Sequence, residues 1–135
     1  MRLPIHPPGW AAPKGYTHGV VASGRLLFIA GQVGCDPKER APSFPPTFGA
    51  QFDLALANLL EVLREAGGTP DHLCRLTMYV TDKHEYLATL GECGESWRRR
   101  VGREYPAMTV AQVVALVPDD AKLELEGTAV LPSQS

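Results

Sequence analysis

The feature that most constrains the fold of this chain is a helix-like repeat of apolar residues followed closely by a strand-like repeat. Between Thr47 and Gly67-Gly68 the apolar residues recur with the spacing of one helix face, as expected for a helix that covers a core. Thr47 is a suitable N-cap and the glycine pair a suitable stop. The apolar positions are Phe52, Leu56, Leu59, Leu60 and Leu63. We therefore expect one long helix with a single face to bury.

The run Leu73–Val80 that follows alternates with a period of two, the pattern of a strand with one buried face. This face should pack against the helix, because each element has one apolar side to bury. The other face is too apolar to be left in water, and its natural cover is a second copy of the chain. The first face consists of Cys74, Leu76, Met78 and Val80, and the second of Arg75, Thr77 and Tyr79.

Two β-prone runs precede the helix, over residues 16–22 and 25–30. Ser23-Gly24 joins them, which predicts a tight hairpin, since glycine accepts the positive φ that such turns need. Residues 31–46 are rich in proline and are interpreted as a long loop.

A second helix is expected between Asp82, with Glu85 as its capping partner, and Arg98–Arg100. Gly91 and Gly94 weaken it, which suggests close packing on the sheet. Its apolar positions are Tyr86, Leu90, Cys93, Trp97 and Val101.

Two further strands, over residues 107–117 and 122–130, close the chain. The order is β-β-α-β-α-β-β, which predicts an α+β fold with one mixed sheet and both helices packed on one face. We expect a single domain over residues 1–135, with residues 1–15 as an extended N-terminal arm.

Composition narrows the classes of partner and site that the chain can have. The 135 residues carry a formal charge of −2 and a pI near 6.1, which removes the electrostatic argument for binding nucleic acid or anionic lipid. Three cysteines without a Cys-x-x-Cys spacing argue against a disulfide framework or a zinc site. No signal-peptide pattern or membrane-spanning run is visible. We expect a cytoplasmic protein that binds a small metabolite, with no metal and no membrane or nucleic-acid partner.

Few residues point to chemistry. Glu124 and Glu126 alternate with leucines in the last strand, so both carboxylates lie on one face. That face is either a solvated edge, or it places a carboxylate in a cleft to orient or deprotonate a water molecule. Cys35 could be a nucleophile, but no histidine is near it in sequence, which favours an inert thiol. Cys74 and Cys93 lie on apolar faces and are expected in the core. The four histidines, which favour structural roles, are His6, His18, His72 and His84.

Several segments together make the chain resemble the reactive-intermediate deaminase (Rid, or YjgF-like) family, over about residues 10 to 130. The resemblance implies a chorismate-mutase-like fold and a homotrimer with three ligand clefts between subunits. It also implies hydrolysis of enamines or imines to carbonyl compounds and ammonia without a cofactor. The segments are Gly15–Val20, Phe28–Gln32, Gln51, Asn58, Ala66-Gly67, Met78–Asp82, Tyr105–Ala107 and Lys122–Glu126.

One departure from the family is important. Members that clear 2-aminoacrylate have an arginine after the Tyr/Phe-Pro-Ala segment, where it grips the substrate carboxylate. Here that position is Met108, and the neighbouring family cysteine is replaced by Val110. Glu124, which matches the water-orienting carboxylate, is retained, as are Tyr16 and Gly31.

The resemblance therefore suggests an enamine or imine deaminase acting on a metabolite other than a simple 2-imino acid. Glu124 would orient the attacking water, Tyr16 would contact the substrate, and the Gly31 backbone would bind its polar end. The apolar wall of the cleft is assigned to Met108 with Val110, Trp97 and Tyr105. Two alternatives stay open: a non-catalytic trimer that binds a small ligand, and, more weakly, an endoribonuclease that inhibits translation. Arg98–Arg100 and Arg103 are the sole candidate RNA stripe, and helix capping accounts for them.

Overall fold

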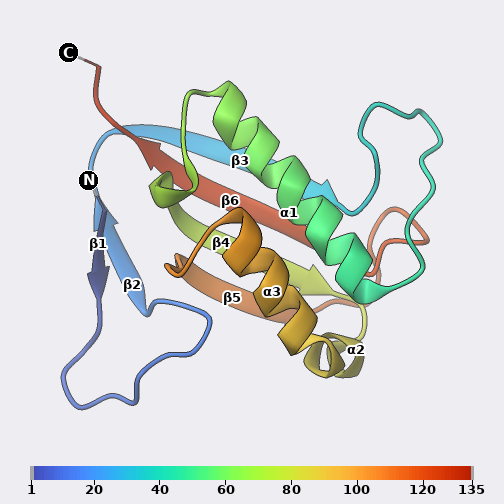
Figure 1. Cartoon of the computed structure of the whole chain (residues 1–135), viewed down its shortest axis with the longest axis horizontal. Coiled ribbons are helices and arrows are strands. Elements are labelled where there is room, and N and C mark those ends of the chain that lie inside the picture. The colour runs from blue at the N-terminus through green and yellow to red at the C-terminus, as the bar shows by residue number, and fades with distance from the viewer. Residues whose placement is uncertain (1, 135) are drawn as a thin grey trace.

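A computed structural model describes residues 2–134 (Figure 1). Four strands form a mixed sheet in the order β3-β6-β4-β5, in which β4 and β5 are parallel and the other pairs antiparallel. The long helices α1 and α3 lie on the same side of this sheet (Figure 1). The predicted α+β class, with one mixed sheet and helices on one face, is confirmed. The elements are β1 (Arg2–Ile5), β2 (Gly19–Ala22), β3 (Arg25–Val33), α1 (Phe48–Glu65), a 3-10 turn (Pro70–His72), β4 (Leu73–Val80), α2 (Lys83–Ala88), α3 (Leu90–Arg100), β5 (Ala107–Gln112) and β6 (Leu123–Leu131).

Helix α1 forms as its pattern predicts. The Thr47 hydroxyl accepts a hydrogen bond from the Ala50 N–H at 3.2 Å, which satisfies one of the free N–H groups of the first turn. Its buried face packs on β3 and β6. This face comprises Phe48, Phe52, Ala55, Leu56, Leu59 and Leu63, with Leu60 partly buried beside it.

Strands β4 and β6 supply the opposite wall of the core. Every second residue of β6 from Leu123 to Leu131 is buried, so Glu124 and Glu126 share the other face, as predicted. In β4 a register shift between Leu73 and Arg75 turns Leu73 into the core and leaves Cys74 half-buried. The expectation that Cys74 lies in the core is therefore corrected, because the bulge breaks the period of two at that point.

The predicted hairpin over Ser23-Gly24 is wrong. Strand β2 pairs with β1 in a separate two-stranded ribbon, and β3 pairs with β6 instead. Gly24 has a φ of +146° and its Cα lies against the Leu131 carbonyl, where a Cβ would stand 2.0 Å from the oxygen. The chain thus changes sheets at Gly24, and the first residues of the predicted arm become strand β1 (Figure 1).

The predicted second helix is divided into α2 and α3 at Thr89. The Thr89 hydroxyl donates to the Glu85 and Tyr86 carbonyls at 3.0 and 3.1 Å, so this threonine bonds locally and its backbone leaves the helical region. Asp82 caps α2 as predicted, but the Glu85 carboxylate pairs with Lys122 at 3.0 Å instead of capping in return.

Other boundaries also differ. Gly91 faces open space, and a Cβ on Gly94 would meet only the end of Arg98 at 3.6 Å, so neither glycine packs on the sheet as expected. The strand predicted over 107–117 ends at Gln112, because a loop with the fully exposed Val114 and Val117 follows. No helix among residues 2–134 is long and apolar enough to cross a bilayer.

Candidate functional site

An apolar cavity of about 270 Å³ lies between the helices and the β4–β5 side of the sheet. Three residues that the sequence assigned to the wall of the cleft, Trp97, Tyr105 and Met108, all line it. Met108 enters from β5 beside Leu76 of β4, so its side chain lies on the helix side of the sheet. The remaining lining residues are Lys14, Gly15, Phe52, Met78, Tyr86, Leu90, Cys93 and Gly94.

The aromatic wall of the cavity is fixed in place. The rings of Trp97 and Tyr105 stack with centroids 5.3 Å apart and planes 9° from parallel. Trp97 is buried, and its indole N–H donates to the Glu104 carbonyl at 3.0 Å, which satisfies its one polar group. Cys93 beside it is a thiol at neutral pH, since burial raises its pKa to about 11. The cavity thus offers flat apolar surfaces and no activated sulfur.

Residues 13–17 form a strap at the mouth of this cavity. The Thr17 N–H donates to the Pro106 carbonyl at 3.0 Å, and its hydroxyl to the Tyr105 carbonyl at 2.7 Å. Thr17 also bridges Ala107 in parallel at the start of β5. These bonds hold the strap where Lys14 and Gly15 border the cavity.

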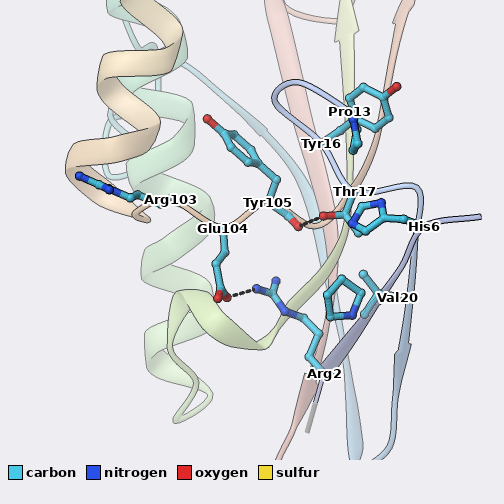
Figure 2. Close-up of a pocket in the computed structure, with 10 residues that line it drawn as sticks. Arg2, His6, Pro13, Tyr16, Thr17, Val20, Arg103, Glu104 and Tyr105 are labelled. Atoms are coloured by element: carbon cyan, nitrogen blue, oxygen red, sulfur yellow. Dashed lines mark hydrogen bonds and ion pairs between the residues drawn. The ribbon is translucent and has the colours of Figure 1, made fainter. Parts of the chain in front are cut away.

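A second hollow, of about 350 Å³, also borders the strap, and its lining is shown in Figure 2. Tyr16 lines it, together with Tyr105, which therefore borders both hollows. An ion pair of 2.8 Å between Arg2 and Glu104 crosses its lower part (Figure 2). Tyr16 also lies edge-on to the His18 ring, with centroids 5.2 Å apart. Tyr16 is thus next to the apolar cavity but not in its lining.

Glu124 and Gly31 meet on the opposite, open face of the sheet. A Cβ on Gly31 would lie 2.7 Å from the Glu124 carboxyl carbon, so only glycine leaves room for this carboxylate as it stands. Glu126 differs from Glu124, because it accepts a hydrogen bond from the Tyr79 hydroxyl at 2.5 Å. That bond raises the pKa of Tyr79. The partner of Glu126 is thus a phenol.

One chain does not bring all of the predicted site residues together. Met108 and Val110 lie on the helix side of the sheet, packed against the core, while Glu124 lies on the other side. Val110 lies beside the core without lining the cavity. Two groups therefore result: Glu124 with Gly31, and Met108 with Trp97 and Tyr105.

The structure also bears on Cys35 as a candidate nucleophile and on the grouping of metal-ligating side chains. Cys35 is buried, and burial together with Asp36 and Glu39 raises its pKa, so the loop thiol is not activated. Among residues 2–134 no three His, Cys, Asp or Glu side chains are grouped so that they could hold a metal ion.

Two arginines of the candidate RNA stripe connect helices. Arg99 and Arg100 bind Asp53 of α1 at 2.5 and 2.8 Å. The hydrogen bonds from Arg100 lower the pKa of Asp53 to about 2. This part of the stripe is therefore engaged in helix packing.

Lys14 is the charged residue of the cavity that sequence reasoning missed. A signal was present, because Lys14 is the sole Lys, Arg, Asp or Glu between Arg2 and Arg25. Lys14 comes close to Met108 because the strap pairs with the start of β5. These two segments are far apart in sequence. No periodicity of the sequence predicts such a contact.

Comparison with known proteins places these features in a family. A family model described as Endoribonuclease L-PSP matches residues 9–131. The chain belongs to this family. Among solved structures, YyfB of Yersinia pestis, described as a protein of unknown function of the conserved Rid protein family, aligns with a TM-score of 0.84. It is 35% identical, over 96% of this chain and 98% of that one. The resemblance to the Rid family is thereby confirmed.

Of two further similar proteins, one was solved with a bound ligand and the other is named for an activity. TdcF of Escherichia coli, solved with bound serine, has a TM-score of 0.69 at 30% identity over 92% of each chain. A 2-iminobutanoate/2-iminopropanoate deaminase of Rattus norvegicus is 28% identical over 89% of this chain and 82% of its own length.

Proposed function

We propose that this protein is a cofactor-free deaminase that hydrolyses an enamine or imine with an apolar body. The observation that carries the proposal is the cavity at Met108, where the Rid resemblance places a carboxylate-binding arginine and this chain has apolar walls. Related proteins named as deaminases support the reaction class. The cavity supports the change of substrate, since an apolar lining favours an apolar group.

In this reaction water adds to the carbon of the C=N bond, and the resulting carbinolamine expels ammonia to leave a carbonyl group. The enamine form first tautomerises to the imine, by gaining a proton at carbon and losing one from nitrogen. Glu124 passes a proton from the attacking water to the imine nitrogen, which gives the neutral carbinolamine, and then passes the proton of the carbinolamine hydroxyl to the same nitrogen, which leaves as ammonia. Each transfer returns Glu124 to its carboxylate form, so the proton balance closes without a cofactor. The Gly31 backbone and Tyr16 contact the polar end of the substrate. Glu124 suits this role because its carboxylate, unlike that of Glu126, is not engaged by Tyr79.

The assembly that we propose is a homotrimer with the ligand clefts between subunits. The sheet separates Glu124 from the cavity within one chain, so a site that uses both needs Glu124 from one subunit and the cavity from the next. The open face of the sheet also exposes Leu26 and Phe28 of β3, at 62% and 74%, which favours burial against another copy. We expect sedimentation to give three times the chain mass of 14.6 kDa. A monomer at micromolar concentration would contradict this assembly.

Small 2-imino acids are expected to be poor substrates, because Met108 offers no donor to their carboxylate. The lost charge-assisted contact corresponds to about 1.5–3 kcal/mol, or about 10- to 150-fold in kcat/KM. The variant Met108→Arg should recover activity on 2-iminopropanoate, measured as ammonia release from the freshly generated imine. Met108→Leu, which changes shape without adding a donor, should not. Equal rates for all three proteins would show that residue 108 does not select the substrate.

The reaction itself is tested by an ammonia-release screen over freshly generated imines with apolar side groups. Turnover that requires Glu124 supports the deaminase. Binding of the same compounds without turnover, in an assembled trimer, would instead support the alternative of a non-catalytic ligand-binding protein.

A further inference from the structure

The apolar cavity has one charged side chain at its border. Among the residues that line it, Lys14 is the sole Lys, Arg, Asp or Glu, and the walls around it are aromatic, aliphatic or sulfur-containing. Lys14 makes no ion pair within residues 2–134. An ammonium group at the mouth of an apolar cavity, without an acidic neighbour in its lining, is available to an anion from outside.

The position of Lys14 is fixed by the backbone and not by a salt bridge. The strap that carries it is held three residues further on, where Thr17 bonds to the Tyr105 and Pro106 carbonyls. Tyr105 is itself part of the aromatic wall. The same contacts therefore place the base of Lys14 beside the aromatic wall, while its flexible stem sets the exact reach of the charge.

We propose that Lys14 binds the anionic group of a ligand whose apolar body fills this cavity, and that the ligand is an aryl or alkyl carboxylate. This inference rests on the proposed function, since it specifies the substrate of the same cleft. Charge complementarity carries the assignment of a carboxylate, because the border of the cavity offers a cation and no anion. The flat walls formed by Trp97 and Tyr105 favour an aromatic body, which stacks on such surfaces.

Lys14 does not simply replace the family arginine at another position. It comes from the strap at the mouth, whereas Met108 comes from β5 inside the cavity. The ligand's carboxylate would therefore lie at the entrance and its apolar part further in. A lysine is also a point charge with a flexible stem and lacks the planar fork of arginine, so it should tolerate different lengths between the carboxylate and the ring.

The test compares two probes of nearly equal shape, 3-phenylpropanoate and its neutral amide 3-phenylpropanamide. Binding is measured by calorimetry on the assembled wild-type protein and on Lys14→Gln. Lys38→Gln is the matched control, since it removes the same charge from a loop residue outside the cavity. We expect the wild type to bind the carboxylate about tenfold more tightly than the amide. This preference should disappear in Lys14→Gln, persist in Lys38→Gln, and weaken as salt is raised.

Equal affinity of the wild type for both probes, or absence of binding by either, would overturn the assignment of Lys14. An equal loss of preference in both lysine variants would also overturn it, because it would indicate a general effect of net charge. The deaminase is tested separately by its dependence on Glu124. A failed Lys14 test leaves that ammonia release in place, whereas a failed deaminase leaves the preference for the carboxylate probe in place.

Discussion

Replacing Glu124 with glutamine is expected to lower ammonia release from a verified imine substrate by about 100-fold or more, the usual contribution of a general acid or base. Glutamine keeps the size and most of the hydrogen-bonding capacity of the side chain but cannot accept the proton of the attacking water. The loss should appear in kcat, measured under substrate saturation, with the trimer and the melting temperature nearly unchanged.

Glu126 provides the matched control on the same strand face. Its carboxylate is bound by the Tyr79 hydroxyl, and a glutamine oxygen can accept the same bond. Glu126→Gln should therefore keep activity within a few-fold, while the pKa of Tyr79 falls towards its ordinary value, because the carboxylate no longer raises it. Full activity of Glu124→Gln would remove this residue from the mechanism. Loss of assembly would indicate a structural role instead.

Among the substitutions proposed for this protein, replacing Gln51 with leucine is expected to lower the stability of the fold most. The Gln51 side chain is 1% exposed and joins three backbone groups of two loops. Its amide donates to the Pro45 and Asp120 carbonyls at 2.9 and 3.0 Å, and its oxygen accepts from the Lys122 N–H at 2.9 Å. Leucine makes none of these part-buried bonds, and the loss of each costs about 1–1.5 kcal/mol. The free energy of unfolding should fall by about 3–5 kcal/mol in urea denaturation.

Gln112→Leu serves as the comparison for this prediction. Gln112 is exposed and accepts one hydrogen bond, from the Lys83 N–H at 2.8 Å, so water can replace the glutamine. Its loss should cost less than about 1 kcal/mol. If Gln51→Leu were as stable as Gln112→Leu, the three bonds of Gln51 would not be holding the loops together.

The parts of the fold that could be predicted are those in which one apolar face must be buried. Strands β4 and β6 follow their period of two, because a shift of one residue would expose the entire apolar face. Helix α1 follows its own periodicity because it has one apolar face to bury. The same reasoning failed where a side-chain hydrogen bond or an irregularity of the strand interrupted the pattern. Thr89 divides the second helix with its hydroxyl, and the bulge beside Leu73 moves Cys74 out of the core.

The candidate site was predicted less completely than the fold. Resemblance to a family pointed to Glu124, Gly31 and Met108, and the structure places the first two against each other. Sequence alone did not reveal that the sheet separates Met108 from Glu124, since this depends on the face to which each side chain turns. It also missed Lys14, whose place at the cavity depends on the strap bound by Thr17.

The contact between Gly31 and Glu124 also limits how this protein can evolve. Any side chain at position 31 would occupy the space of the carboxyl group, and this carboxyl group, as the end of a flexible side chain, would have to turn aside. A lineage in which position 31 has acquired a side chain therefore holds the carboxylate in another position. The identity of this one residue consequently separates descendants that keep the present position of the carboxylate from those that have moved it.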